Sequence, residues 1–448
     1  MFNLVKNSLG GMFGKKANPI GVDFGTDSLK MAQVTWEGAE PRLIAAASAE
    51  VPTHVRNNAA ARFAFFTETT RELLATGGFK GRRAILALPA ASMHIQHIRL
   101  AKMDDEMMKK ALPWEARGKL PIDPSHALMR HLIAGEVYHD SEPKNEIILM
   151  AAGRDMVNQL LDAAGKAKLD VIGMSVEPSA LVDCFGHIYF RMEDFTAVNC
   201  FVDIGCASSR AVIARGSKIL FARSIKIGGE HLTRAVSGHL KISMDDARML
   251  RLKLCYQQPG LDDQHRKHTI DAEDEGRSAA ASRVNRNSKF RVDGNQQDAE
   301  AEADTDAAEV ATLTAELRGT ATAQKRSTDP KAQQASVEEA CREPLNQLAS
   351  ELDLCRRYYE SAFPNKPVDR LIFVGGEAKH RSLCQHIAHE MSLSAQIGDP
   401  LIRMGRTTNV GIESGLDRRQ SQPGWAVAIG LSLGPTANSP VAAPVESK

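Results

Sequence analysis

The sequence lacks a long hydrophobic run: none of its apolar stretches approaches the roughly 20 residues that a transmembrane helix needs. Its seven cysteines are scattered and never spaced as C-x-x-C, which is typical of a reducing compartment and disfavours a zinc site. Neither sign of charge is in excess, because 56 basic and 55 acidic residues nearly balance, so the overall charge gives no attraction to nucleic acid or acidic lipid. What the chain does have is length, and its 448 residues suffice for two or three domains with large cores.

The most informative stretch covers residues 20–34 and reads IGVDFGTDSLKMAQV. A short apolar lead runs into an acid and a glycine, small polar residues and a lysine follow, and alternation then resumes, which predicts two strands joined by a tight turn. Such a turn can bind phosphate, because glycine lets the backbone approach a ligand and the N–H groups, hydroxyls and lysine supply donors and positive charge. The acid at the strand end can hold the water of a magnesium ion. Taken alone, an acid-glycine hairpin is more often only a hairpin. The candidate residues are Asp23, Gly25, Thr26, Asp27, Ser28 and Lys30.

A second stretch repeats this pattern at residues 200–213, CFVDIGCASSRAVI, where an apolar strand again ends in an acid and a glycine before small residues and the cation Arg210. Two such hairpins far apart in one chain predict two related halves that each offer a loop to one ligand. A third piece, residues 370–383 with the sequence RLIFVGGEAKHRSL, predicts a buried strand, a glycine pair and a helix. A glycine pair at a helix start lets a flat ring or a phosphate lie against the helix N-terminus, although an ordinary strand-turn-helix has the same pattern. The candidates from both pieces are Asp203, Gly205, Ala207, Ser208, Gly375 and Gly376.

In this order the three pieces resemble the two phosphate motifs and the adenosine motif of the actin-like ATPase superfamily. The chain is similar, more narrowly, to the PilM family of type IV pilus assembly proteins, relatives of the cell-division protein FtsA, over residues 18–434 except for one long insert. The further segments that carry this resemblance are ALPWEARGKLPIDPSHALMRHLI, MAAGRDMVNQLLDAAGKAKLDVIGMSVEPSAL, FARSIKIGGEHLTRAV and PGWAVAIGLSLG. The resemblance implies an α/β protein with the actin-like ATPase fold, in which two related α/β halves bind ATP and Mg²⁺ and an FtsA-type 1C subdomain is inserted in the first half.

The resemblance also divides the chain into subdomains. Outside the region of resemblance, residues 1–17 are expected to form a flexible leader, because Gly10 and Gly11 disfavour the alternative of a membrane-surface helix. Residues 257–336 have almost no large apolar residue, which predicts a disordered insert, either a tolerated surface insertion or, less favoured, a binding arm. The divisions are subdomain 1A at 18–91 and 172–196, subdomain 1C at 92–171, subdomain 2A at 197–240 and 368–418, subdomain 2B at 241–367 with the insert, a C-terminal helix packing on 1A at 419–434, and a disordered tail at 435–448.

Hydrophobic periodicity predicts the elements within these divisions. Subdomain 1C is expected to be strand, helix, strand, strand and helix, with its first helix interrupted at Pro113. The inward face of its last helix, residues 155–167, is expected to carry Met156, Leu160, Leu161 and Ala164. Residues 337–360 predict a long helix, and residues 400–415 predict a loop. The buried stripe of the long helix is expected at Leu345, Leu348, Leu352 and Cys355.

Other positions matter only through the resemblance. It implies that Asp23 and Asp203 act as the catalytic pair by orienting the water shell of the metal, and that Gly228 and Gly229 approach the nucleotide, although a plain turn fits this glycine pair as well.

The chain departs from the family at three places. Phe24 replaces a small aliphatic residue, Glu377 stands where a third glycine is common, and the helix from Ser243 to about residue 256 lacks the usual acid and lysine that face the ribose. That helix has Asp246, Arg248, Arg251 and Lys253, of which Arg251 or Lys253 could substitute.

The function that the resemblance implies is a cytoplasmic ATP-binding scaffold of the type IV pilus assembly platform, peripheral to the inner membrane. Its groove between subdomains 1A and 1C is expected to take the N-terminal cytoplasmic tail of a PilN-like bitopic membrane protein. Other pilus platform proteins are expected as partners, nucleic acid is not, and the membrane is reached only through partners. No residue stands out to position an attacking water, so at most a slow ATPase is expected. The alternative is a pseudo-ATPase interaction module of a pilus or type II secretion platform; a sugar kinase is disfavoured because no sugar-site signature lies between the hairpins.

Overall fold

The computed structural model describes residues 17–38, 40–139, 142–186, 188, 196–257, 330–406 and 416–434. By its contacts the chain separates into two units, one comprising Met1–Cys255 with Val337–Lys448 and the other Tyr256–Ser336. Almost all of the predicted leader, the predicted tail and most of the predicted insert lie outside the described residues. Within the described ranges, no helix is both long and apolar enough to cross a membrane.

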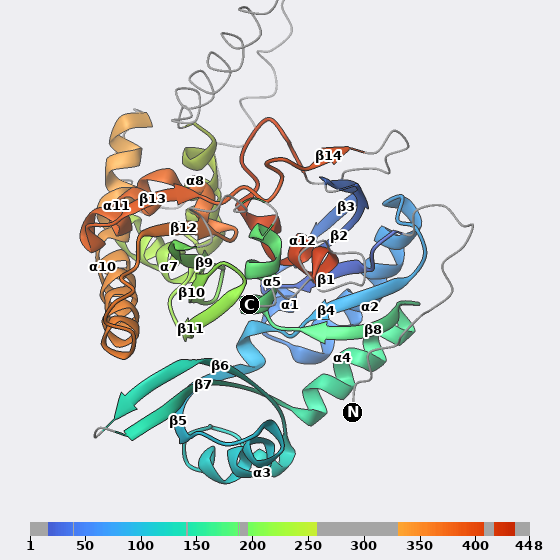
Figure 1. Ribbon diagram of the computed structural model, residues 1–448. Helices are drawn as coiled ribbons and strands as arrows, with labels where there is room; N and C mark the ends of the chain where they lie inside the picture. The colour runs from blue at the N-terminus through green and yellow to red at the C-terminus, as the bar shows by residue number, and fades with distance from the viewer. Residues whose placement is uncertain are drawn as a thin grey trace, which may run out of the picture. The chain divides into compact units, whose positions relative to one another are not determined.

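The first lobe is built on a six-stranded sheet in the order β14-β3-β2-β1-β4-β8 (Figure 1). Its strands are β1 (Ile20–Phe24), β2 (Ser28–Glu37), β3 (Glu40–Glu50), β4 (Arg83–Ala87), β8 (Asp170–Ser175) and β14 (Gly405–Arg406). The first three form an antiparallel meander, and β4 and β8 continue the sheet in parallel with β1. The short β14 pairs with β3 inside the predicted loop 400–415, because two residues are too few to show a strand period in the sequence.

Three helices bury their apolar faces in the core of this first sheet. They are α1 (Thr53–Arg56), α2 (Ala59–Thr76) and α4 (Arg154–Lys166). The inward face of α4 differs from the predicted one, since Leu161 is 38% exposed and Met156 is only partly buried. Leu160 and Ala164 are buried as predicted, and the neighbours that complete their face are Val157 and Ala163. α4 also packs against α2, so it belongs by packing to the first lobe.

The second lobe repeats this topology in a five-stranded sheet with the order β11-β10-β9-β12-β13. Its strands are β9 (Val198–Ile204), β10 (Ser209–Arg215), β11 (Lys218–Ile225), β12 (Arg370–Val374) and β13 (Ser394–Ile397). In both sheets the first three strands stand in the reverse of their chain order, and the two later strands follow in parallel with the first. This repeat confirms the two related halves that the paired hairpins predict.

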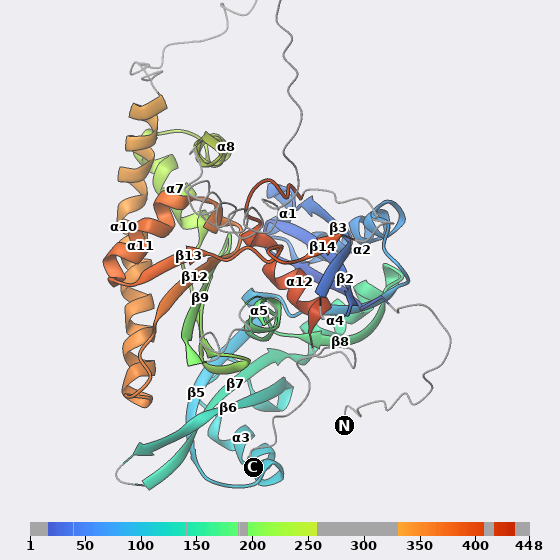
Figure 2. The same cartoon turned by 45° about the horizontal axis from the view of Figure 1, so that its top comes forward.

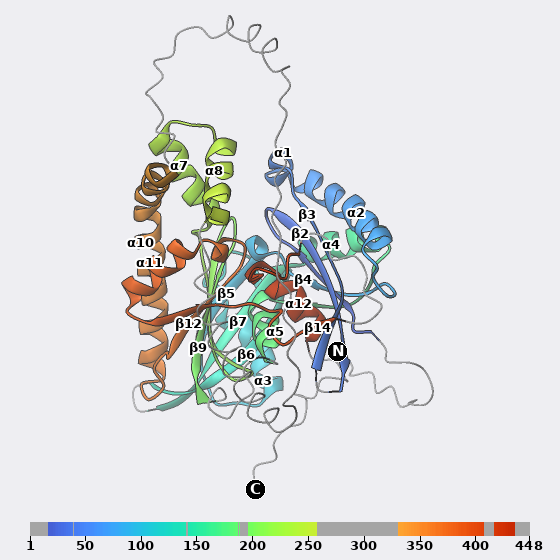
Figure 3. The same ribbon diagram turned by 90° about the horizontal axis from the view of Figure 1, so that it is seen from above.

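The helices of the second lobe are α7 (Gly229–Leu240), α8 (Met244–Gln257), α10 (Pro330–Ala362) and α11 (Arg381–Met391). α10 and α11 lie on the side of the second sheet that faces away from the first lobe (Figure 3). The predicted apolar stripe of α10 is buried in the core, from Leu345 to Cys355. Ser243 caps α8 as predicted, because its hydroxyl accepts a hydrogen bond from the N–H of Asp246 at 3.0 Å.

Two helices, α5 (Glu177–Phe185) and α12 (Ala426–Leu433), lie between the two sheets and pack on each other (Figure 2). α12 packs on β1, β2 and β4, whereas α5 packs on β10 and β11. The contact of α12 with α5 and its contact with β1 both depend on glycine. A Cβ added at Gly430 would overlap the carbonyl oxygen of Ala180, and one added at Gly21 would overlap that of Ala428. The last helix therefore packs directly on the first sheet.

An inserted unit between β4 and α4 has its own three-stranded sheet in the order β5-β7-β6, with α3 on one face (Figure 1). Its elements are β5 (Met93–Ala101), α3 (Asp105–Glu115), β6 (Ala127–His139) and β7 (Glu142–Gly153). The order strand, helix, strand and strand is the predicted one. α3 continues through Pro113 and is not interrupted there.

A buried polar cluster joins the inserted unit to the second lobe. The carboxylate of Glu146, 1% exposed, accepts hydrogen bonds from Arg99 Nε at 2.9 Å and from the Tyr358 hydroxyl at 2.8 Å. Its Oε1 also lies 2.9 Å from Nδ1 of His97, whose ring stacks on Phe221 with centroids 4.6 Å apart. Because Tyr358 and Phe221 belong to α10 and β11, this cluster fixes the inserted unit against the second lobe.

Candidate functional site

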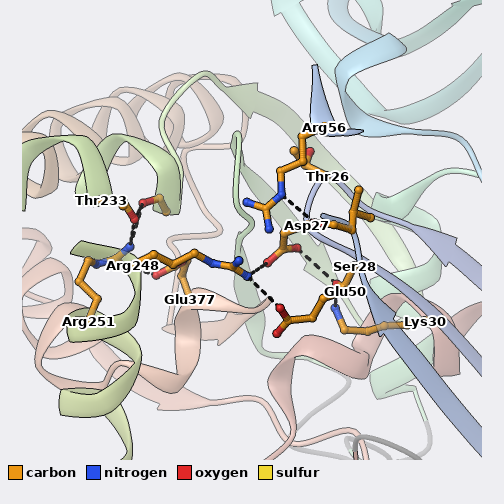
Figure 4. Close-up of polar contacts among 12 residues, drawn as sticks. Thr26, Asp27, Ser28, Lys30, Glu50, Arg56, Thr233, Arg248, Arg251 and Glu377 are labelled. Carbon is orange, nitrogen blue, oxygen red and sulfur yellow. Dashed lines mark hydrogen bonds and ion pairs between the residues drawn. The ribbon is translucent and has the colours of Figure 1, made fainter. Parts of the chain in front are cut away.

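The first hairpin forms a tight turn between β1 and β2. Asp23 stands opposite Lys30 in the register of the two strands, and the N–H of Gly25 donates a hydrogen bond to the carbonyl oxygen of Ser28 at 2.9 Å. The Lys30 ammonium donates to the Ser28 hydroxyl at 2.8 Å, which itself lies 3.3 Å from Asp27 Oδ1 (Figure 4). The turn thus gathers a cation, a hydroxyl and two acids at the end of the strand.

The second hairpin reproduces this geometry between β9 and β10. Asp203 stands opposite Arg210, and the N–H of Gly205 donates to the carbonyl oxygen of Ser208 at 3.1 Å. In this hairpin the acid and the cation form an ion pair, with Arg210 Nη1 3.1 Å from Asp203 Oδ2. The two turns are therefore equivalent in register and backbone bonding, although their charges are arranged differently.

Both turns open onto one cavity of about 490 Å³ between the lobes. Every predicted residue of the two hairpins and of the later glycine pair lines it. These residues are Asp23, Gly25, Thr26, Asp27, Ser28, Lys30, Asp203, Gly205, Ala207, Ser208, Gly375 and Gly376. The fold thus brings together three segments that are separated by well over a hundred residues in the sequence, and the volume lies in the usual range of small-molecule sites.

The remaining predicted pair, Gly228 and Gly229, does not line the cavity. The N–H of Gly229 donates to the carbonyl oxygen of Gly205 at 2.9 Å, and a Cβ added at Gly228 would lie 2.6 Å from the N of Ser208. These glycines therefore pack against the second turn on the side away from the cavity lining. The close approach that requires glycine here is to the second hairpin and not to the cavity.

Gly375 is the position where glycine is required by conformation as well as by space. Its φ is +91°, in the region that side chains avoid, and an added Cβ would overlap Oδ1 of Asp203. Its N–H donates to the carbonyl oxygen of Pro423 at 3.0 Å. The glycine turn is thus held between the second hairpin and the segment that leads into α12, and it is followed by a short 3₁₀ turn, Glu377–Lys379, before α11 begins.

Burial and neighbouring charge set the electrostatics of the cavity. Burial raises the pKa of Asp23 to about 6, an effect that Lys30 opposes and Asp203 reinforces. Glu177, at the start of α5, also lines the cavity and forms an ion pair with Nε of Arg210. Burial raises the pKa of Glu177 above its usual range against the attraction of Arg210. Sequence analysis missed Glu177, since its only signal was a proline-marked helix start.

Arg62 of α2 is a second residue that sequence analysis missed. Its Nη2 donates to the carbonyl oxygen of Gly25 at 3.0 Å and its Nη1 to that of Thr26 at 3.1 Å. Its guanidinium lies 4.6 Å from the ring centroid of Phe24, and that ring is buried against Phe66. Arg62 therefore fixes the backbone of the first turn to α2. No local pattern reveals it, because the contact joins residues 36 positions apart.

Helix α8 approaches the first hairpin through Arg248. Its Nη2 lies 4.0 Å from Asp27 Oδ2 and 3.7 Å from Glu50 Oε2 (Figure 4). Arg251, one turn later, is buried and forms an ion pair with Glu377. Neither Arg251 nor Lys253 lines the cavity, so in this conformation neither replaces the missing ribose contacts of the family pattern.

The acids of the cavity suit a magnesium ion that keeps its water shell. Among the described residues, no group of three or more His, Cys, Asp or Glu side chains could hold a metal directly. Mg²⁺ in phosphate sites commonly uses only one or two carboxylates together with waters and phosphate oxygens. Asp23 and Asp203, one from each turn and close enough for the charge of Asp203 to raise the pKa of Asp23, provide such a pair.

Comparisons with known proteins agree with this geometry. The family model of the type IV pilus assembly protein PilM matches residues 21–257, and that of the cell division protein FtsA matches residues 200–430. A search of curated proteins finds no match.

The solved structure of a PilM–PilN type IV pilus biogenesis complex has a TM-score of 0.64 and 19% identity, and the match covers 93% of this chain and 98% of that one. The ethanolamine utilization protein EutJ from Carboxydothermus hydrogenoformans has a TM-score of 0.46 and 12% identity, with 96% and 94% covered. The first likeness shows the fold, which is the actin-like ATPase fold with the inserted 1C subdomain that the family resemblance implies.

Proposed function

Because this chain belongs to the family of the type IV pilus assembly protein PilM, we propose that it is an ATP-binding, actin-like scaffold of the pilus assembly platform. It works in the cytoplasm at the inner membrane, where it binds the cytoplasmic tail of a PilN-like membrane protein. The observation that carries the ATP-binding part is the pair of hairpins, which have the same register and open onto one cavity. Turn N–H groups, hydroxyls, Lys30 and the glycine turn would hold the phosphates, and Asp23 and Asp203 would orient the waters of Mg²⁺.

The cation is essential to this proposal. The cavity lining carries six carboxylates and four basic side chains, so a phosphate chain alone would meet net negative charge. A divalent ion offsets that charge and makes the acids favourable. Because Glu177 is already ion-paired with Arg210, it is not free to activate a water, and we propose at most a slow hydrolysis.

The partner site that fits the family best is a groove of about 590 Å³ between α2 and α4. α2 belongs to the predicted subdomain 1A and α4 to the predicted subdomain 1C. Four of its eleven lining residues are alanines, and four more carry charge of both signs: Glu68, Arg71, Asp162 and Lys166. An extended peptide tail can lie in such a groove without requiring the helices to part.

Calorimetry with Mg-ATP tests the nucleotide part of the proposal. We expect the native chain to bind and the Asp23→Ala variant to bind about 10- to 100-fold more weakly, since a charged hydrogen-bonding group is lost. The matched control is Asp155→Ala, an exposed acid at the start of α4 that does not line the cavity, and it should bind like the native chain. Failure of the native chain to bind Mg-ATP would contradict the proposal and favour the pseudo-ATPase alternative.

A further inference from the structure

Arg56, the last residue of α1, lines the cavity beside the first turn (Figure 4). Its Nε donates a hydrogen bond to the carbonyl oxygen of Val51 at 3.1 Å, and the N–H of Val51 donates to the carbonyl oxygen of Asp27 at 2.8 Å. The preceding residue, Val55, is buried in the core of the first sheet and holds α1 on it. Arg56 is therefore fixed next to the first turn, and one side of its guanidinium is bonded.

The other side of that guanidinium is unsatisfied. Nη2 of Arg56 is buried and has no hydrogen-bond partner among the residues that the structure describes. Asp27, the acid of the neighbouring turn, lies 4.0 Å from Nη2 of Arg248 instead. A buried donor without an acceptor costs free energy, so a ligand that brings an acceptor to this atom gains from it.

The other three basic side chains of the cavity lining are bonded to the protein. The Lys30 ammonium donates to the Ser28 hydroxyl, and Arg210 is ion-paired with Asp203. Arg62 donates to two carbonyl oxygens of the first turn. Among the described residues that line the cavity, Arg56 is therefore the basic side chain that presents a buried, unsatisfied donor.

Arg56 lies close to the tips of both turns. Burial raises the pKa of the Cys206 thiol, at the tip of the second turn, to about 12, and Asp27 adds to this rise while Arg56 opposes it. Burial also lowers the pKa of Arg62, and the charge of Arg56 lowers it further. Two arginines that repel each other beside both turn tips favour an anion at this position.

The position of the glycine turn indicates which part of a ligand this anion is. The glycine turn resembles the adenosine motif, and Gly375 packs on Asp203 and Pro423 and not on α1. With the nucleoside at the glycine turn, the phosphate chain runs toward the tips of the two hairpins. Arg56 then faces the end of the chain that is farthest from the nucleoside.

We propose that Arg56 binds the terminal phosphate of the ligand and lets the site distinguish a triphosphate from a diphosphate. Its Nη2 donates to an oxygen of that phosphate, while its Nε keeps the hydrogen bond to Val51. A diphosphate leaves Nη2 unsatisfied and lacks one charge-assisted hydrogen bond, so it binds more weakly. This inference rests on the phosphate role of the two hairpins in the proposed function, and it adds a residue that lies outside the three sequence motifs.

Calorimetry with Mg-ATP and Mg-ADP tests the inference on the full chain. We expect the native chain to bind ATP at least about tenfold more tightly than ADP. In the Arg56→Gln variant the affinity for ATP should fall at least about tenfold, while the affinity for ADP stays within about twofold. Magnesium tripolyphosphate, which has three phosphates and no nucleoside, should lose affinity by about the same factor as ATP. The matched control is Arg83→Gln, at an exposed position of β4 outside the cavity lining, and it should bind like the native chain.

The outcomes separate this inference from the proposed function. If the native chain binds neither nucleotide, the phosphate role of the hairpins is wrong and the inference falls with it. If the native chain binds ATP and ADP equally, or if Arg56→Gln weakens both by the same factor, the phosphate role stands and the inference is wrong, because Arg56 then only supports the turn. Should Arg56→Gln fail to fold, Arg56→Met decides: it keeps the length of the side chain without its charge, and an unchanged ratio of the two affinities would contradict the inference.

Discussion

Asp23 and Asp203 occupy equivalent positions in the two hairpins, but their surroundings give them different electrostatics. Asp203 is ion-paired with Arg210, which Glu177 also contacts. At Asp23 burial dominates and raises the pKa to about 6, although Lys30 stands opposite in the neighbouring strand. The charge of Asp23 therefore changes within the accessible pH range, and a bound cation would favour its ionised form.

This difference gives a prediction for the pH dependence of binding. We expect the affinity for magnesium tripolyphosphate to rise between about pH 5 and about pH 7, because Asp23, with its raised pKa, must lose a proton before it can hold the metal's waters. One displaced proton limits the effect to about tenfold per pH unit. The Asp23→Asn variant should bind more weakly at pH 7 and lose most of this dependence.

Calorimetry at several pH values on both chains measures this effect. Protonation of the ligand itself is common to the two titrations, so the difference between the native chain and the variant isolates Asp23. Parallel pH profiles would show that Asp23 does not take part.

At the scale of the elements, the sequence predicted what depends on neighbours along the chain. The two hairpins and the buried stripe of α10 follow from local period and turn residues, and they are confirmed. Three of the errors have a common cause in contacts between distant segments. The phase of α4 is set by its packing on α2, β14 exists only because β3 lies beside it, and Arg62 reaches a turn in another part of the chain. The candidate site was likewise predicted where its motifs are local, and Glu177 and Arg62 were missed.

The crossing of α5 and α12 gives a prediction at the same scale. Gly430→Ala should lower the free energy of unfolding by about 1–3 kcal/mol, because its Cβ would overlap the Ala180 carbonyl oxygen and force the two helices apart. Gly165→Ala is the matched control. Gly165 is an exposed glycine in α4 whose Cβ would meet nothing within 4 Å, so this change should raise stability by about 0.5–1 kcal/mol.

Chemical denaturation of the two variants beside the native chain measures both effects. Opposite signs are the expected result for the same substitution in two helices. A loss of stability in both variants, or in neither, would mean that the close approach at Gly430 is not what limits the side chain there.

At the scale of the whole first unit, the cavity and the α2–α4 groove are neighbours. Ala59, Phe63 and Gln159 line both of them. Arg62, adjacent to Phe63 on α2, donates to the carbonyl oxygens of Gly25 and Thr26 in the first turn. A ligand that shifts the first turn therefore acts on the helix that forms one wall of the groove, and a peptide in the groove acts on the turn.

This arrangement predicts that the two sites are coupled. A peptide of the cytoplasmic tail of a PilN-like protein should bind the native chain with an affinity that changes when magnesium tripolyphosphate is saturating. Linkage requires the peptide to change the affinity for tripolyphosphate by the same factor. In the Arg62→Ala variant, which loses both hydrogen bonds to the turn, that factor should move toward one.

Two alanines on α2 provide the test of where the peptide lies. Ala64 lines the groove and is exposed, so Ala64→Arg should weaken peptide binding at least about tenfold by filling the groove. Ala75→Arg places the same side chain on the same helix at an exposed position outside the groove lining, and it should bind like the native chain. Equal binding by both variants would exclude the α2–α4 groove as the docking site. Binding that is lost in Ala64→Arg alone, with a coupling factor of one, would keep the groove as the docking site and reject its connection to the first turn through Arg62.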